Sequence, residues 1–304
     1  MRIYKKTFLI VISFFAIYVI WGSTYLLNKI AVAELAPFFL ASIRFLTSGI
    51  LIFIIAMAMG VSLKLTKHQL LNVIITAFLF LVYGNGVFVW SLRFVDSGFG
   101  ALEAATQPLF VLVLMWLIDG KKIQAKSLIG IILGLIGMCM LVSQEELLIK
   151  EGSLLGMFMI LTCVLSWSYG SIFVSKANLP TNYFVSTGYQ MIAAGIMLAI
   201  SSLLFNEKWV SPFNWSEPVV WSMSFLIVFG GIAAFTAFNY LLKVVSTEKV
   251  ATSAYVNPVI ALLLGWYVLD EKLTLQSIVA AIVLLTGVYF ITSKRKLKIR
   301  PFGR

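Results

Sequence analysis

The chain has 304 residues, of which 61% are hydrophobic and only 12% charged, with a net charge of +11. Soluble domains carry about 25% charged residues, so this composition excludes an ordinary soluble protein and indicates a polytopic membrane protein. The positive charge does not indicate nucleic-acid binding, because the basic residues lie in short loops and at the termini. Both cysteines fall in apolar segments, so we expect neither a disulfide nor a metal site.

Apolar segments long enough to cross a bilayer follow one another along the chain, joined mostly by short connections. The first segment resembles a signal peptide, but its apolar run is longer than a signal core, so we expect a retained helix. The predicted spans are 8–27, 37–58, 70–91, 101–118, 127–144, 153–174, 183–204, 219–242, 250–269 and 274–292.

A duplication runs through this pattern. The stretch from Trp90 to Gly137 recurs without gaps at 240–287. Its informative matches are the pairs Pro108 and Pro258, Trp116 and Trp266, Lys122 and Lys272, and Gly137 and Gly287. Internal repeats of this kind are common in transporters, whose substrate site lies between the repeats. The sequence therefore predicts ten helices in two five-helix repeats, residues 1–150 and 151–304, the second ending in a basic cytoplasmic tail.

The Lys and Arg residues predict the orientation, because cytoplasmic loops are enriched in them. If the N-terminus is cytoplasmic, the opposite side holds only Lys29, Arg93, Lys150, Lys208 and Lys272. We therefore expect both termini in the cytoplasm. Five helices is an odd number, so the second repeat must be inverted relative to the first. Inverted repeats are the structural basis of alternating access.

Three stretches carry a family resemblance: Trp21–Tyr25, Asn257–Trp266 followed by Asp270-Glu271, and the closing helix Ser277–Gly287. With the duplication, they make the chain resemble the EamA family of the drug/metabolite transporter superfamily over nearly its whole length. The resemblance implies a ten-helix carrier of the bacterial inner membrane, often an exporter of amino acids, related metabolites or drugs. Members often have Glu before the proline of the ninth helix. This chain has Asn257 there, so the carboxylate that the family would supply at that position is missing.

Arg44 is the most informative candidate site residue. It lies about 10 Å below the outer surface in the second predicted helix, where a cation costs roughly 3 kcal/mol or more unless it faces a cavity or a partner. One interpretation is a contact for an anionic group such as an amino-acid carboxylate. The other is a structural pair with Glu103, at similar depth in the fourth helix. Both hold if substrate competes for the guanidinium.

Further polar residues stand at matching depths in the two repeats. Gln107 follows Glu103 by one helical turn, and its inverted counterpart is Asn257. The counterpart of Arg44 is Gln190. These amides either line a hydrated central cavity or join helices by hydrogen bonds. Asn85 and Asn239, on the third and eighth helices, have the same two interpretations.

Prolines follow two of these amides. Pro108 and Pro258 each remove a backbone hydrogen bond to the carbonyl four residues earlier. The resulting free carbonyls either contact a substrate ammonium or mark a bend, and we favour the bend. Gly130 and Gly134, on a face that Gly137 extends, form a small-residue pattern for close helix packing, within the fold or between two protomers.

Aromatic side chains surround the polar positions. Such rings suit apolar or cationic groups through stacking and cation–π contact, although belts at the membrane interface are the alternative origin. The predicted site aromatics are Trp21, Tyr25, Tyr83, Trp167, Tyr169 and Tyr255.

The residues predict an alternating-access carrier that exports or exchanges a small zwitterionic or amphipathic metabolite such as an amino acid. Its partners are the substrate and the bilayer, and it is a monomer or a homodimer. An exporter of hydrophobic cations and a non-transporting scaffold are the alternatives. We expect no enzyme, cofactor or metal, because the chain has no P-loop motif and a single histidine, His68. Coupling through Glu103, exchange and facilitated diffusion remain open.

Overall fold

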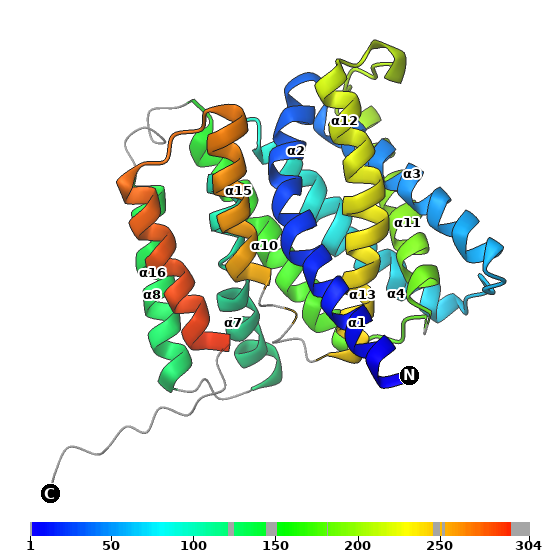
Figure 1. Cartoon of the computed structure of the whole chain (residues 1–304), viewed down its shortest axis with the longest axis horizontal. Coiled ribbons are helices and arrows are strands. Elements are labelled where there is room, and N and C mark those ends of the chain that lie inside the picture. Colours follow the sequence, from blue (N-terminus) through cyan, green and yellow to red (C-terminus); the bar gives the residue numbers. More distant parts are fainter. Residues whose placement is uncertain are drawn as a thin grey trace, which may run out of the picture.

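The computed structural model describes residues 2–120, 125–143, 151–180, 182–245, 250 and 253–292. In these ranges the regular structure is entirely helical (Figure 1). Seven helices are long and apolar enough to cross a membrane, and three shorter apolar helices lie at Lys126–Met140, Val256–Leu269 and Leu275–Phe290. The predicted all-helical membrane fold is therefore confirmed. The predicted basic tail after residue 292 lies outside the described residues.

In chain order, the first half contains α1 (Arg2–Phe15), η1 (Ala16–Ile20), α2 (Trp21–Glu34), α3 (Pro37–Ala58), α4 (Lys67–Ala77), η2 (Phe78–Val87), α5 (Phe88–Ser91), α6 (Ser97–Ala104), α7 (Gln107–Asp119) and α8 (Ala125–Val142). The second half contains α10 (Ser153–Lys176), α11 (Tyr183–Leu204), η3 (Pro212–Asn214), α12 (Glu217–Phe225), η4 (Leu226–Phe235), α13 (Thr236–Val244), α15 (Ser253–Leu269) and α16 (Leu275–Thr292). Of the segments named η, η3 is a short 3₁₀ turn and the others are π-helices.

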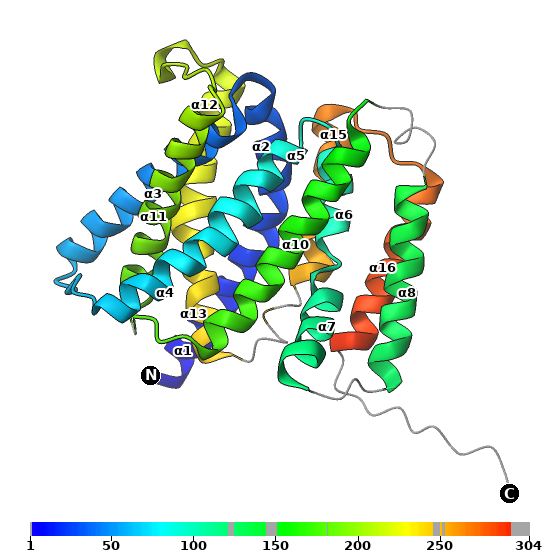
Figure 2. The ribbon, with the colours of Figure 1, turned by 180° about the vertical axis from the view of Figure 1, so that it is seen from behind.

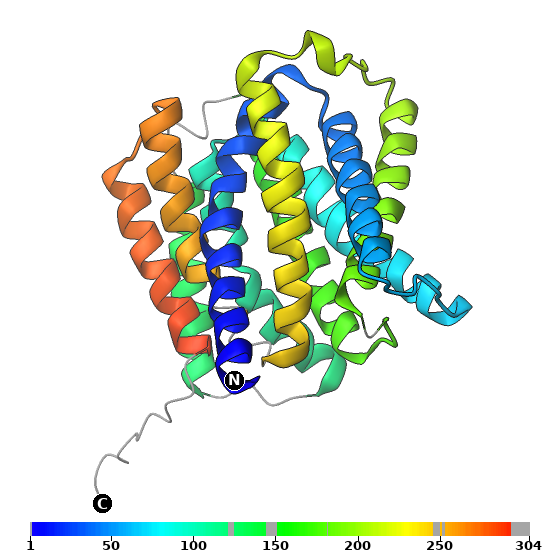
Figure 3. The ribbon, with the colours of Figure 1, turned by 45° about the vertical axis from the view of Figure 1, so that its right-hand side comes forward.

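The most extensive helix contacts pair α3 with α11 and α8 with α16. Figures 1 and 2 show the α8–α16 pair at one side of the bundle and the α3–α11 pair at the other. The start of α1 and the end of α16 lie at the same end of the bundle (Figures 1 and 3). Each close pair therefore joins one helix from each half of the chain.

Glycines allow α8 and α16 to approach closely. A Cβ atom on Gly137 would lie 2.8 Å from the backbone nitrogen of Leu284, and one on Gly287 would lie 2.7 Å from the carbonyl oxygen of Gly130. The predicted small-residue pattern of Gly130 and Gly134 thus packs within the fold, against α16. Of the two predicted roles, packing within the fold or packing between two protomers, the structure shows the first.

The fourth predicted helix corresponds to one apolar span, Ser97–Ile118, interrupted by a turn at Ala105 and Thr106. α6 ends at Ala104, and α7 begins at Gln107. Pro108 stands in the first turn of α7, directly after this interruption, where a missing N–H costs little. Pro258 does lie inside α15, as predicted.

The first helix extends to Glu34, further than its predicted end at Leu27. Two polar residues beyond the predicted end, Asn28 and Lys29, find partners within the bundle. The Asn28 side chain donates to the Thr24 carbonyl at 2.8 Å, and Lys29 Nζ donates to the carbonyls of Leu92 and Val95 at 2.6 Å each. The Leu92 carbonyl follows the last residue of α5. The partial negative charge at a helix C-terminus stabilises a cation such as Lys29 at this position.

In the part of the chain that the structure describes, three membrane helices contain a π-helical segment. Carbonyls in two of these segments, η2 and η4, accept hydrogen bonds from side chains of neighbouring helices. Ser166 donates to Leu79 in η2 at 2.8 Å, and Cys163 donates to Tyr83 at 3.3 Å. Ser48 donates to Ile227 in η4 at 3.0 Å. Carbonyls in an apolar medium require such partners, and π-segments are frequent at functional sites.

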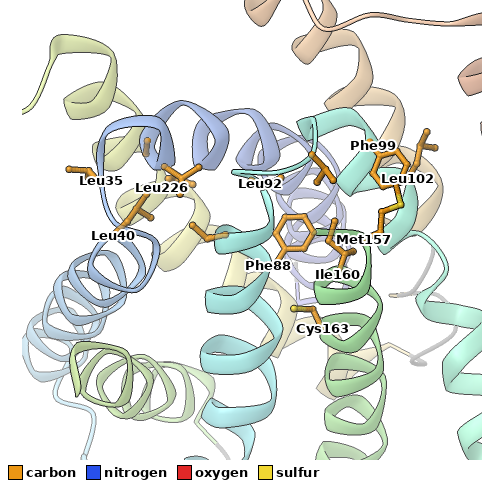
Figure 4. Close-up of a cluster of buried hydrophobic side chains, with 14 of the residues drawn as sticks. Leu35, Leu40, Phe88, Leu92, Phe99, Leu102, Met157, Ile160, Cys163 and Leu226 are labelled. Carbon is orange, nitrogen blue, oxygen red and sulfur yellow. The ribbon is translucent and has the colours of Figure 1, made fainter. Parts of the chain in front are cut away.

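A buried hydrophobic layer joins both halves of the chain (Figure 4). Its members come chiefly from α2, α3, α5, α6, α10, α12, η4 and α16, and include Leu40, Leu92, Leu102, Ile160 and Leu226. The layer fixes the helices that carry the polar residues described next.

Candidate functional site

Arg44 lies on α3 and is only 4% exposed. Its Nη1 donates to the Oδ1 atoms of Asn28 at 3.3 Å and Asn85 at 3.4 Å. The guanidinium carbon also lies 4.9 Å from the centre of the Phe45 ring. Three chain segments, α2, α3 and η2, thus hold one buried cation with neutral amides.

The structure records no ion pair between Arg44 and Glu103, so the predicted structural pair is not formed. Glu103 is also buried, on α6, which packs chiefly against α15. Arg44 Nε and Glu103 Oε2 are both buried without a hydrogen-bond partner. A buried charge held only by neutral groups keeps a strong affinity for an opposite charge.

Gly230, in η4, is a neighbour of both Arg44 and Trp21. A Cβ atom on Gly230 would lie 3.3 Å from Arg44 Nη2 and 3.1 Å from Thr24 Cγ2. The Gly230 carbonyl accepts a hydrogen bond from Trp21 Nε1 at 3.3 Å. The guanidinium and the Trp21 ring therefore meet at one residue.

The aromatic cluster consists of Trp21, Phe80, Trp167, Phe235 and Phe238. Trp21 lies 5.0 Å from Phe238 and 6.1 Å from Trp167 between ring centres, and Phe80 lies 4.8 Å from Trp167. Trp21 and Trp167 are half-buried, so part of each ring remains accessible. The cluster offers a surface for an apolar or aromatic group next to a cation.

The other predicted aromatics lie elsewhere. Tyr25 packs edge-to-face against Phe88, with ring centres 5.4 Å apart, beside the buried hydrophobic layer. Tyr83 has its ring 6.3 Å from that of Phe78. Tyr169 is 45% exposed and does not join the cluster, because it lies about 200° round α10 from Trp167. The side chain of Tyr255 is outside the described residues.

A second buried polar group lies between α11 and α13. Gln190 donates to Ser186 Oγ at 3.1 Å, and Asn239 donates to Thr187 Oγ1 at 2.7 Å. Asn239 therefore joins two helices by a hydrogen bond, one of the two predicted interpretations. Gln190 Oε1 and Thr236 Oγ1 are buried without a partner, so this group has capacity for a water molecule or a polar ligand.

Gln107 is half-buried at the start of α7, where its carbonyl accepts from Ser168 at 3.4 Å. The turn at Ala105 and Thr106 lies between Gln107 and Glu103. In the ranges that the structure describes, no three His, Cys, Asp or Glu side chains gather as metal ligands would.

Asn257 binds the backbone of the first helix. With its amide oriented to satisfy both contacts, its nitrogen donates to the carbonyls of Ile17 at 3.0 Å and Tyr18 at 2.9 Å. Both carbonyls belong to η1. Asn257 is thus used in helix–helix bonding, the second of its predicted roles.

We expect Asn257→Leu to lower the free energy of unfolding by about 2 kcal/mol, because it leaves buried carbonyls without a donor. The melting temperature in detergent measures this. Asn214→Leu, at an exposed position in η3, is the matched control and should change little. Equal melting temperatures for the two variants would show that the η1 carbonyls do not depend on Asn257.

Sequence reasoning missed Asn28, Thr24 and Gly230. Asn28 follows Trp21 at the spacing of two helical turns, so both belong to one helix face. That spacing was a usable signal, but the predicted helix end at Leu27 excluded it. Nothing local in the sequence marks Gly230 as the contact of Arg44.

Comparison with known proteins places these features in a family. The profile described as the EamA-like transporter family matches residues 8–143 and 154–293. The inner membrane transporter YedA of Escherichia coli K12 is 37% identical over 93% of this chain and 92% of its own length. The transporter YoaV of Bacillus subtilis 168 is 24% identical over 95% of this chain and 99% of its own.

A third relative bears the name "Probable amino-acid metabolite efflux pump" in Escherichia coli K12, with 24% identity over 89% of this chain and 90% of its own. A solved crystal structure superposes with a TM-score of 0.67 at 17% identity, covering 92% of this chain and 95% of that chain. At this identity the superposition shows a shared fold.

Proposed function

The chain belongs to the EamA-like transporter family, and from this premise we propose that it is a secondary carrier that exports or exchanges a small carboxylate-bearing metabolite, such as an amino acid, across the bacterial inner membrane. The observation that carries the proposal is Arg44, a buried guanidinium without a carboxylate partner beside an aromatic cluster. A relative named as an amino-acid metabolite efflux pump agrees with this substrate class.

In the proposed complex, Arg44 binds the substrate carboxylate, which would supply the acceptor that the buried Nε lacks. A planar guanidinium matches a carboxylate with two parallel hydrogen bonds. Trp21 and Trp167 then pack on the substrate side chain. Asn257 takes no part in binding the amino group, because its amide is engaged with η1.

The aromatic cluster alone would also suit a hydrophobic cation. Arg44 opposes that alternative, since Trp21 and the guanidinium share Gly230 as a neighbour and a second cation would be repelled there. Saturable flux into proteoliposomes distinguishes the candidates. We expect saturable flux of carboxylate-bearing metabolites. Flux of lipophilic cations alone would favour an exporter of hydrophobic cations, and the absence of any flux would favour a scaffold protein.

We further propose that residues 1–150 and 151–304 are inverted repeats that rock against each other. The family profile matches the chain twice, which supports this division. The α3–α11 and α8–α16 pairings provide further support, because a two-fold axis brings equivalent helices together. So does the occurrence of π-segments in the third helix of each half, η2 and η4.

Carboxylates that join the two halves at one end of the bundle support alternating access. Glu207 accepts from the backbone nitrogens of Phe38 at 3.1 Å and Phe39 at 2.8 Å, at the start of α3. Glu34 accepts from the backbone nitrogen and hydroxyl of Ser216, before α12. A carboxylate at a helix N-terminus is favoured by the free N–H groups and the helix dipole.

Glu271 makes the third such contact, with α6. It accepts from the Ser97 nitrogen at 2.8 Å, the Ser97 hydroxyl at 2.7 Å and the Gly98 nitrogen at 3.1 Å. In the proposed orientation all three carboxylates lie at the outer end. We propose that they hold the outer side closed in this conformation and release it when the carrier opens outward.

Glu271→Gln should weaken this closure, since the amide has one acceptor oxygen instead of two. We expect hydrogen exchange of the α6 amides to accelerate by about tenfold, which corresponds to roughly 1.4 kcal/mol. Glu217→Gln, at an exposed residue in the first turn of α12, is the control. An unchanged rate of hydrogen exchange in α6 would contradict the proposal that Glu271 helps to hold the outer side closed.

A further inference from the structure

A groove of about 370 Å³ lies between α4, α7 and the C-terminal part of α10. Figure 2 shows these three helices on one face of the bundle. The residues lining the groove include His68, Ile118, Tyr169, Phe173 and Lys176. The groove lies near the ends of α7 and α10 and the start of α4, so it is at a membrane–water interface.

The groove is separate from the candidate substrate site. On α10, Trp167 faces the aromatic cluster, Ser166 donates to Leu79 in η2, and Ser168 donates to Gln107 at the start of α7. Tyr169 is about 200° round the helix from Trp167, so it points outward between these two neighbours. The groove therefore opens on the lipid-facing side of α10.

Its lining is divided by chemistry. Ile118, Ile172 and Phe173 provide an apolar wall on α7 and α10. His68, in the first turn of α4, and Lys176, in the last turn of α10, provide exposed basic groups. Among the side chains that the structure describes, those lining the groove include no carboxylate. An amphiphile with an anionic head and an acyl chain matches this arrangement.

A hydrogen bond fixes the polar part of the groove. Asn72 Nδ2 on α4 donates to the carbonyl of Asn178, two residues beyond the end of α10, at 3.0 Å. This bond ties the start of α4 to the end of α10, and so holds His68 and Lys176 at the same opening. The site is therefore preorganised, which reduces the cost of binding.

We propose that this groove binds an anionic phospholipid of the adjacent leaflet, the one whose head groups lie level with His68 and Lys176. Lys176 and His68 contact the phosphate, and the first part of an acyl chain lies along Ile172 and Phe173. The proposal is independent of the transported substrate. Such a lipid would stabilise the contact between α4, α7 and α10, and so the folded protein.

The test uses the purified full chain in detergent, titrated with phosphatidylglycerol or with phosphatidylcholine of the same acyl composition. Phosphatidylglycerol should raise the melting temperature more, by several degrees, and Lys176→Gln should lose at least half of this difference. Lys67→Gln, an exposed neighbour of His68 outside the groove lining, should retain it. His68→Gln provides a second variant if Lys176→Gln folds poorly.

Three outcomes would overturn the proposal. The first is equal stabilisation by the two lipids. The second is an undiminished preference for phosphatidylglycerol in both Lys176→Gln and His68→Gln. The third is equal protection by soluble glycerol phosphate, which would identify a site for free anions and leave no role for the acyl chain.

Discussion

Arg44→Met is expected to abolish binding and transport of carboxylate substrates while leaving the folded protein at least as stable as the wild type. Loss of one partner of a buried charge pair costs roughly 2–5 kcal/mol, which corresponds to about 30-fold to several thousand-fold in affinity. Without substrate, however, Arg44 is a buried cation held by the amides of Asn28 and Asn85 and by the Phe45 ring. Replacing such a charge by an apolar side chain is often neutral or stabilising.

Flux in proteoliposomes and the melting temperature of the same preparation measure the two effects. Arg93→Met is the matched control, because the Arg93 side chain donates to the Leu35 carbonyl at 3.3 Å and is not part of the aromatic cluster. Arg44→Lys keeps the charge but loses the planar fork, so we expect intermediate flux. A destabilised Arg44→Met with normal flux per folded molecule would make Arg44 a structural residue.

Gly287→Ala is expected to lower the free energy of unfolding by about 3 kcal/mol or more and to reduce the yield of folded protein. Its Cβ atom would lie 2.7 Å from the Gly130 oxygen and 2.8 Å from the Gly134 nitrogen. Both are backbone atoms, so the clash is relieved only if α8 and α16 separate, and overpacking of this kind typically costs 1–3 kcal/mol even where side chains yield.

Size-exclusion profiles and melting temperatures in detergent measure this loss. Val279→Ile adds a methylene to α16 at a position 38% exposed, and it should be tolerated. Gly137→Ala should behave like Gly287→Ala, since its Cβ atom would lie 2.8 Å from the Leu284 nitrogen. A wild-type melting temperature for Gly287→Ala would mean that the two helices are further apart than described.

The all-helical membrane fold was predictable from composition and apolar periodicity alone. The break between α6 and α7 was not, because Pro108 is compatible both with a bend inside a helix and with the first turn of a new one. The π-segments also escaped prediction. Their cause is tertiary: donors such as Ser166 and Asn257 reach them from helices far away in the sequence.

For the candidate site, the sequence predicted how deep the polar side chains lie in the membrane, but not which neighbours they contact. The buried position of Arg44 follows from its place in an apolar segment, and Asn85 was among the predicted polar residues. Which of several groups at one depth Arg44 meets depends on how the helices rotate and pack. For that reason the structure forms no ion pair between Arg44 and Glu103, and Tyr169 lies outside the aromatic cluster that contains Trp167.

The most direct test of the account is competition between acids and their amides for flux into proteoliposomes. A metabolite transported by the wild type is identified first, and unlabelled analogues are then added with the carboxylate intact or converted to the neutral amide. We expect the acid to compete, the amide to fail, and Arg44→Met to show no saturable flux. Equal competition by acid and amide, or undiminished flux in Arg44→Met, would contradict carboxylate recognition by Arg44.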